Sequence, residues 1–167
     1  WLIYKNTERG AGWQVGHTSL GFNKVAYLNT YAAPDTSSTP FNDTAPSTTL
    51  LTLGGDGDSG TNKDGEVMVG YAFAEVQGFS KMSTYMLKYH GGAGYNWKIY
   101  DSKRDSYNGL DANLDADTTD AEPAEANMQI DLVSNGFKIR STNSNHNNSG
   151  YTYHYMAFAE APFVNSN

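Results

Sequence analysis

Two glutamates recur at equivalent places in the chain and are its first candidates for chemistry. Glu75 follows Tyr71-Ala72-Phe73-Ala74, and Glu160 follows Met156-Ala157-Phe158-Ala159, 85 residues later. Two carboxylates roughly 5 to 9 Å apart would suit glycoside hydrolysis. A repeated glutamate can equally solve a structural problem, such as accepting hydrogen bonds at a strand end, and this needs no active site. The structural interpretation is favoured, so we assign no catalytic residue.

The acidic loop Asp56–Asp64 contains three aspartates that could hold a calcium ion. Counted from Asp56, an EF-hand needs glycine and glutamate at its sixth and twelfth positions, where the chain has Thr61 and Val67. A calcium site of another kind remains open. The matching loop Ser144–Asn148 has no carboxylate, which favours a solvated hairpin loop. We therefore predict no metal site.

Nucleophilic and cofactor chemistry find little support. The segment Gly16–Gly21, with Ser19 inside it, misses the Gly-x-Ser-x-Gly elbow by one residue, and no helical pattern follows it. The four histidines form no metal-spaced pair, and His154 is expected to be an interior histidine. No glycine-rich phosphate loop precedes a helix, and the absence of cysteine excludes thiolate sites. No cofactor is predicted.

Aromatic and amide side chains could bind a ligand without reacting with it. Trp13 and Trp97 recur 84 residues apart, which favours a place in the core for both. Better candidates for surface binding are two tyrosines and a histidine that lie in loops and have no aromatic counterpart in the other half of the chain. A neighbouring asparagine joins them. The predicted ligand-binding residues are Tyr95, Tyr107, Asn145 and His146.

Charge and hydropathy exclude two classes of partner. The 167 residues include 11 basic and 18 acidic side chains, a net charge of −7, whereas nucleic-acid binding requires a clustered positive surface. The longest uncharged apolar run is Val67–Ala74, far below the length of a membrane-spanning helix. We expect neither a nucleic-acid nor a membrane partner. The chain opens at Trp1, as a processed chain or an excised piece would, so targeting is not visible.

The candidate residues above lie in a chain whose sequence contains an internal repeat. Besides the tryptophans and the glutamates, Leu51-Thr52-Leu53 matches Phe137-Lys138-Ile139 at an offset of 86. Landmarks of different kinds in one order and one register indicate an internal duplication. We predict two β-repeat units of about 84 residues, at 1–82 and 83–167, which can share one sandwich.

Hydrophobic side chains alternate with a period of two, which is typical of strands. Both alternating sets are apolar in Val67–Glu75, so that strand is expected to be covered on both faces, and Asn135-Gly136 is predicted to be a hairpin turn. The pattern predicts an all-β fold, an antiparallel β-sandwich of the jelly-roll or immunoglobulin-like kind. The other expected strands are Leu2–Tyr4, Trp13–Val15, Val25–Leu28, Leu50–Leu53, Met86–Leu87, Trp97–Tyr100, Met128–Leu132, Phe137–Arg140 and Tyr151–Glu160.

Several longer segments carry a family resemblance. They are Trp97–Asp105, Leu132–Arg140, Tyr155–Phe163, Tyr71–Lys81 and Asn42–Pro46. In these segments the chain resembles the tandem β-repeat region of tail-fibre-type structural proteins of tailed bacteriophages, mainly marine ones. It departs from them in having only Lys81–Tyr85 where such proteins usually carry a longer insert. The resemblance implies a place in a virion or otherwise outside the cell. It also implies a homo-oligomer such as a trimer, contacts with other virion proteins, and a lectin-like or architectural role.

Two classes of function follow. The first is a non-enzymatic virion structural or adhesion module, which is either purely architectural or lectin-like with a cell-surface glycan as its ligand. It accounts together for the duplication, the strands and the missing catalytic set. The alternative is a glycosidase on a jelly-roll sandwich, with Glu75 or Glu160 as the acid, or a carbohydrate-binding module. The neighbouring sequence would separate these classes, and neither the receptor nor the host can be read from the chain.

Overall fold

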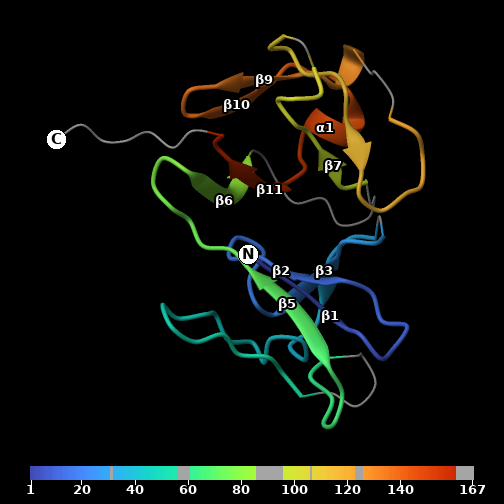
Figure 1. Cartoon of the computed structure of the whole chain (residues 1–167), viewed down its shortest axis with the longest axis vertical. Helices are drawn as coiled ribbons and strands as arrows, with labels where there is room; N and C mark the ends of the chain where they lie inside the picture. Colours follow the sequence, from blue (N-terminus) through green and yellow to red (C-terminus); the bar gives the residue numbers. More distant parts are fainter. Residues whose placement is uncertain (31, 56–60, 86–95, 106, 123–125, 161–167) are drawn as a thin grey trace, which may run out of the picture. The chain divides into compact units, whose positions relative to one another are not determined.

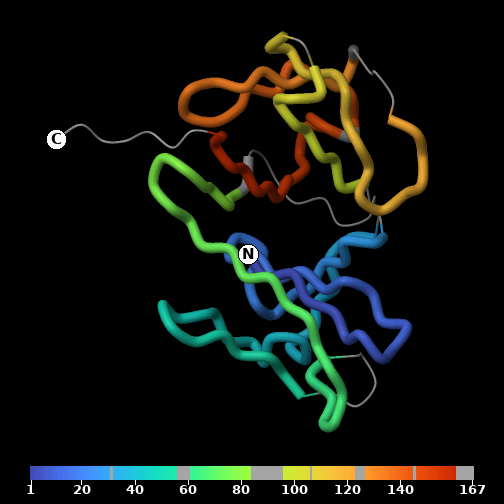
Figure 2. Tube along the Cα trace, viewed as in Figure 1, coloured from blue at the N-terminus to red at the C-terminus, as the bar shows by residue number. Residues whose placement is uncertain are grey.

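A computed structural model describes residues 1–30, 32–55, 61–85, 96–105, 107–122 and 126–160. The chain forms two compact units, which are described separately. Unit 1 comprises Trp1–Leu28, Ala32–Tyr85 and the described chain from His154 onward. The described residues of unit 2 are 29–30, 96–105, 107–122 and 126–153. Figure 1 labels the elements and Figure 2 traces the path of the chain.

The main sheet of unit 1 has five strands in the order β4-β3-β2-β1-β5 (Figure 1). The first four form an antiparallel meander, and β5 returns to pair antiparallel with β1. Alternation of side chains produces this sheet, since every second residue of β1 is buried. The strands are β1 (Leu2–Asn6), β2 (Gln14–Gly16), β3 (Lys24–Tyr27), β4 (Asp35–Thr36) and β5 (Met68–Ala72).

A second sheet in unit 1 joins strands that are far apart in the sequence. Strand β6 (Ser80–Tyr85) pairs with β11 (Tyr153–Phe158), and the Ala159 amide donates to the Phe79 carbonyl at 2.7 Å. By sequence β11 ends the second repeat, yet from His154 onward it packs in unit 1. The compact units therefore group the chain differently from the two sequence repeats.

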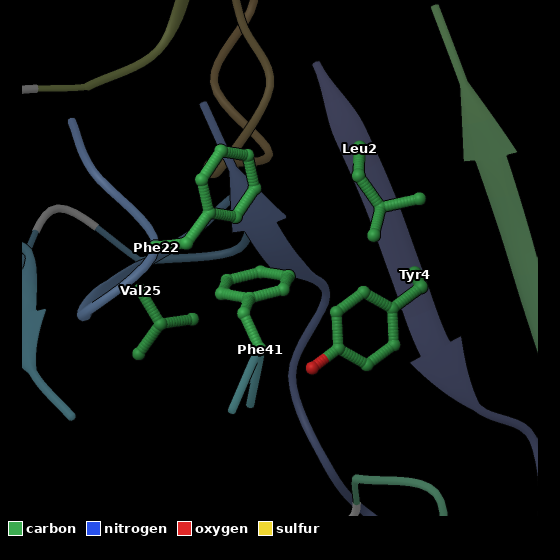
Figure 3. Packing of buried hydrophobic residues seen from close by; sticks show 5 residues of the cluster. All are labelled: Leu2, Tyr4, Phe22, Val25 and Phe41. Atoms are coloured by element: carbon green, nitrogen blue, oxygen red, sulfur yellow. The ribbon is translucent and has the colours of Figure 1, made fainter. Parts of the chain in front are cut away.

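The core of unit 1 lies against β1, β2 and β3. Its buried cluster consists of Leu2, Tyr4, Phe22, Val25 and Phe41 (Figure 3). Phe41 comes from the loop after β4, and its ring makes edge contacts with the rings of Tyr4 and Phe22 at centroid distances of 5.8 and 5.4 Å. Edge-to-face packing of this kind stabilises aromatic clusters beyond the area that they bury. A loop residue thus fills the centre of the core.

Unit 2 is built from short antiparallel pairs. Strand β7 (Lys98–Ile99) pairs with β8 (Leu114–Asp115), and β9 (Ile130–Val133) pairs with β10 (Gly136–Ile139). The described helical residues are the 3-10 turn η1 (Ala126–Met128) and the four-residue helix α1 (Ser144–Asn147). No helix in the described ranges is long and apolar enough to cross a membrane.

The hairpin of unit 2 turns one residue earlier than predicted. Val133 pairs with Gly136, so the two-residue turn is Ser134-Asn135, whereas the sequence pointed to Asn135-Gly136. Gly136 has a φ of 152° and opens β10. Glycine accepts this positive φ without the clash that a Cβ would cause.

The predicted all-β antiparallel sandwich is confirmed, and both halves use related pairings. Strand β5 pairs with β1, and its counterpart β11 pairs with β6. The carbonyl of Trp13, before β2, accepts from the Leu28 amide, and the carbonyl of Trp97, before β7, accepts from the Ala116 amide. The recurring tryptophans therefore precede strands of the same kind of hairpin. Both were expected in the core, but both are half-buried.

The strand predicted at Val67–Glu75 is not covered on both faces. Strand β5 is an edge strand of its sheet, and its Tyr71 side chain is 52% exposed. Among the described strands it has a neighbour on the β1 side only. Phe158 at the end of β11 is also exposed, and the segment Leu50–Leu53 forms no strand.

Candidate functional site

An open pocket of about 200 Å³ lies on unit 2 beside the exposed ring of Tyr107. That side chain is 85% exposed, the largest exposure among the large hydrophobic side chains of the described residues. The pocket combines one aromatic ring, one carboxylate, a hydroxyl, an amide and two aliphatic side chains. Its lining residues are Ser102, Asp105, Tyr107, Asn108, Leu110 and Leu132.

Backbone and side-chain hydrogen bonds fix the floor of the Tyr107 pocket. Leu110 and Ile130 exchange backbone hydrogen bonds of 2.8 and 3.1 Å, which attaches the pocket segment to β9. The Asn108 side chain extends this pairing, because it donates to the Leu132 carbonyl and accepts from the Leu132 amide, both at 2.8 Å. Gly109 turns the chain between these attachments with a φ of 108°. Tyr107 therefore projects from a fixed backbone.

The polar wall of the pocket is also held in place. The Asp105 carboxylate accepts from the Ala112 amide at 3.3 Å, and the Asp101 carboxylate accepts from the Lys103 amide at 2.9 Å in the preceding turn. The Arg104 guanidinium pairs with Glu122 and holds the pKa of that carboxyl below its usual value. Asp105 keeps a second carboxylate oxygen that can accept a hydroxyl from a ligand.

The described residues of the pocket carry no grouping for a metal. Among the described residues no cluster of three histidine or acidic side chains could hold an ion. Asp56 and Asp58 of the acidic loop Asp56–Asp64 lie outside the described residues. Hydroxyl, amide and carboxylate groups around an exposed ring are typical of sites that hold a small polar ligand by hydrogen bonds and stacking.

Two of the predicted ligand-binding residues, Tyr107 and His146, can be compared, and they are not brought together. Tyr107 lines the pocket, whereas His146 is buried inside unit 2, where its Nε2 lies 2.7 Å from the Tyr100 hydroxyl. Burial, with Lys98 nearby, lowers the pKa of His146 to about 4. The prediction of a surface position for His146 is therefore wrong, because α1 folds that side chain inward. Asn145 lies in α1, its side chain is outside the described part, and Tyr95 lies outside the described residues.

Glu75 performs the structural task that the sequence favoured. Its carboxylate accepts from the Lys81 ammonium at 2.7 Å and from the Met82 amide at 3.2 Å, across the turn that leads into β6. The bond from Lys81 is the main reason why the pKa of Glu75 is lowered. The carboxylate is therefore ionised at neutral pH and unsuited to be a general acid. Glu160 is exposed.

A serine between two histidines in unit 1 was missed by sequence reasoning. The Ser19 hydroxyl lies 2.6 Å from His17 Nδ1 and 3.1 Å from His154 Nδ1. The Ser19 amide also donates to His17 Nδ1, so that nitrogen is an acceptor. Burial, followed by the neighbouring His154, lowers the pKa of His17 to about 4, and burial also lowers the pKa of His154. Both imidazoles are neutral at pH 7 and connect β11 to the main sheet.

Comparison with known proteins identifies the domain. A family model described as a domain of unknown function (DUF7483) matches residues 1–91 and again residues 85–162. The chain belongs to the DUF7483 family. No curated protein and no solved structure matches it. Two tandem DUF7483 copies confirm the internal duplication that the recurring residues indicated.

The Tyr107 pocket belongs to the second DUF7483 copy and lies in a connection that is longer than the corresponding one of the first copy. In the first copy β2 and β3 are joined by residues 17–23, whereas in the second copy β7 and β8 are joined by residues 100–113 (Figure 2). The pocket residues Ser102 to Leu110 lie in this longer connection. At the repeat offset Tyr107 corresponds to Phe22 or Asn23, and Phe22 is buried in the core of unit 1. The second copy therefore carries added surface that the shared fold does not need.

Proposed function

We propose that this DUF7483 chain is a non-enzymatic structural and adhesion module of a phage tail fibre or similar particle appendage. In this proposal the second copy binds a cell-surface glycan at the Tyr107 pocket. The observation that carries the proposal is the exposed Tyr107 ring beside a fixed set of hydrogen-bonding groups in the longer connection of that copy. Loops on a rigid scaffold are where binding residues concentrate.

The chemistry of the pocket suits a sugar. A pyranose ring has apolar C–H groups on its faces and hydroxyls around its rim, so that it can stack on Tyr107 while its hydroxyls bond to Asp105 and Ser102. Enclosed small-molecule sites usually measure about 300–1,000 Å³. A volume of about 200 Å³ in an open site fits one projecting residue of a longer glycan better than a whole cofactor.

The contacts of Glu75 support the non-enzymatic proposal over the glycosidase. A glycosidase needs one carboxyl with a raised pKa as acid. Glu75 has a lowered pKa and accepts hydrogen bonds within its own turn. From the tail-fibre resemblance we further propose a virion location, copies of the chain as partners in a homo-oligomer, and contacts with other virion proteins.

The test is glycan binding by three variants of the full chain. Tyr107→Ala should lower the affinity for a bound glycan at least tenfold on an array of bacterial surface polysaccharides, followed by titration of the best hit. Tyr107→Phe should keep most of it, since the ring remains. Leu50→Ala, a truncation of another exposed side chain in unit 1, is the matched control and should bind as wild type.

Two results would reject this function. Equal affinity of wild type and Tyr107→Ala would place binding elsewhere, and cleavage of any polysaccharide by the wild-type chain would favour the glycosidase. The variant Asp105→Asn keeps the shape of the side chain and removes its charge, so it shows whether glycan binding needs the carboxylate. A loss in that variant as large as in Tyr107→Ala would mean that the carboxylate is essential.

A further inference from the structure

The outer edge of β5 offers free backbone hydrogen-bonding groups. Trp1 and Phe73 exchange backbone hydrogen bonds of 3.1 and 2.8 Å, and the Thr7 amide donates to the Val67 carbonyl at 3.0 Å. Because hydrogen-bonding direction alternates along an antiparallel strand, the odd-numbered residues of β5 bond to β1. Met68, Gly70 and Ala72 therefore direct their N–H and C=O groups away from β1, and within the described residues no strand pairs with that side.

The two edges of the same sheet differ in how they are protected. Strand β4, at the other edge, has only two residues, Asp35–Thr36, and both are exposed. Shortness and charge are the usual means of preventing edge-to-edge pairing. Strand β5 has five residues, no charged side chain and no proline. The edge at β5 thus lacks the features that keep a strand from accepting another.

We propose that β5 pairs with β5 of a second copy of this chain in an antiparallel, two-fold contact centred on Gly70. In this register Gly70 lies opposite its own copy and Met68 lies opposite Ala72, so the outward-facing residues of both strands meet each other. The residues between them also match, since Tyr71 lies opposite Val69 of the second copy. The same strand therefore supplies matching backbone groups and matching side chains on both sides of the contact, as an isologous interface requires.

The charges beside β5 do not oppose a second copy, in spite of the net charge of −7. The glutamates that flank the strand are neutralised within their own chain. Glu66 pairs with Arg9 at 2.6 Å, and Glu75 pairs with Lys81 at 2.7 Å. A two-fold contact therefore brings together an uncharged strand and two compensated ends, without unpaired like charges opposite each other.

The test compares Gly70→Pro with Gly70→Ala in the full chain by sedimentation velocity over a wide concentration range. Proline removes one outward N–H that bonds to nothing in the described chain and adds a ring at the edge. Alanine keeps the N–H, and its Cβ would lie 3.6 Å from Tyr4 Cβ, an ordinary contact. We expect a wild-type dimer of twice 18.2 kDa, an unchanged Gly70→Ala dimer, and a dissociation constant at least tenfold higher for Gly70→Pro.

A wild-type monomer or trimer at all concentrations, or equal dimerisation of Gly70→Pro, would overturn the proposal. If Gly70→Pro fails to fold, amide hydrogen exchange of the wild type decides. The Gly70 and Ala72 amides should be protected in concentrated samples and exchange on dilution, while the Val69 and Tyr71 amides, bonded to β1, stay protected at both concentrations. Concentration-independent exchange at Gly70 would reject the pairing. Glycan binding at Tyr107 is a separate readout, so either proposal can fail alone.

Discussion

Replacing Gly16 by alanine should destabilise unit 1 because the core has no room for a methyl group there. A Cβ on Gly16 would lie 2.6 Å from Cζ and 2.8 Å from Cε1 of Phe41, where about 3.4 Å or more is ordinary contact. The Phe41 ring is fully buried between Tyr4 and Phe22 and cannot retreat without displacing one of them (Figure 3). Overpacking of this kind costs about 1–3 kcal/mol, and the overlap of nearly 1 Å places the expected loss at about 2–3 kcal/mol.

A double-mutant cycle with Phe41→Leu isolates the clash. Leucine is shorter than the ring, so Gly16→Ala in the Phe41→Leu background should cost less than about 0.5 kcal/mol, which is a coupling of about 2 kcal/mol. Urea unfolding followed by fluorescence and circular dichroism measures each free energy. Gly10→Ala is the control, because a Cβ at Gly10 would contact nothing within 4 Å. An equal cost of Gly16→Ala in both backgrounds would refute the packing argument.

Two further predictions concern titration and the repeated glutamates. The pKa of His17 is about 4 in the folded chain and about 6.5 when unfolded, so the unfolded chain takes up a proton first as the pH falls. The contribution of His17 to the free energy of unfolding should be level above pH 6.5 and fall by up to about 1.4 kcal/mol per pH unit between pH 6.5 and 4, in addition to the contributions of His146 and His154. The variant His17→Gln should flatten part of this slope in unfolding measurements, and an unchanged slope would contradict the assignment. Changing Glu75 or Glu160 to Gln should leave glycan affinity within twofold of wild type in titration calorimetry, and a tenfold loss would implicate these carboxylates in binding.

Local alternation was sufficient to predict most strands. Short apolar runs marked β1 and β3, apolar and polar residues alternate in part through β9 and β10, and both patterns are local properties of the chain. The duplication was also readable, because it needs only residue identities at a constant offset. Leu50–Leu53 shows the limit, since its alternation matches β10 but the segment forms no strand.

What the sequence could not reveal depends on contacts between distant segments. The prediction that β5 is covered on both faces was wrong, because a strand with apolar residues on both faces can also lie at the edge of a sheet. Phe41 lies in the core although its loop shows no hydrophobic periodicity. Ser19 contacts His154, which is 135 residues away in the sequence. His146 was misplaced because a loop histidine without a counterpart in the other half can be folded inward as readily as outward. The exposed position of Tyr107 was expected, and its role in binding stays a prediction.

The central claim is glycan binding without turnover at the Tyr107 pocket, and a nuclear magnetic resonance titration of the full chain with the best array glycan tests it most directly. The account predicts concentration-dependent shifts of the Tyr107 ring and of the Asn108 and Leu132 amides, with the glycan recovered intact. Shifts centred instead on Ser19 and His154, or cleavage of the glycan during the titration, would contradict it.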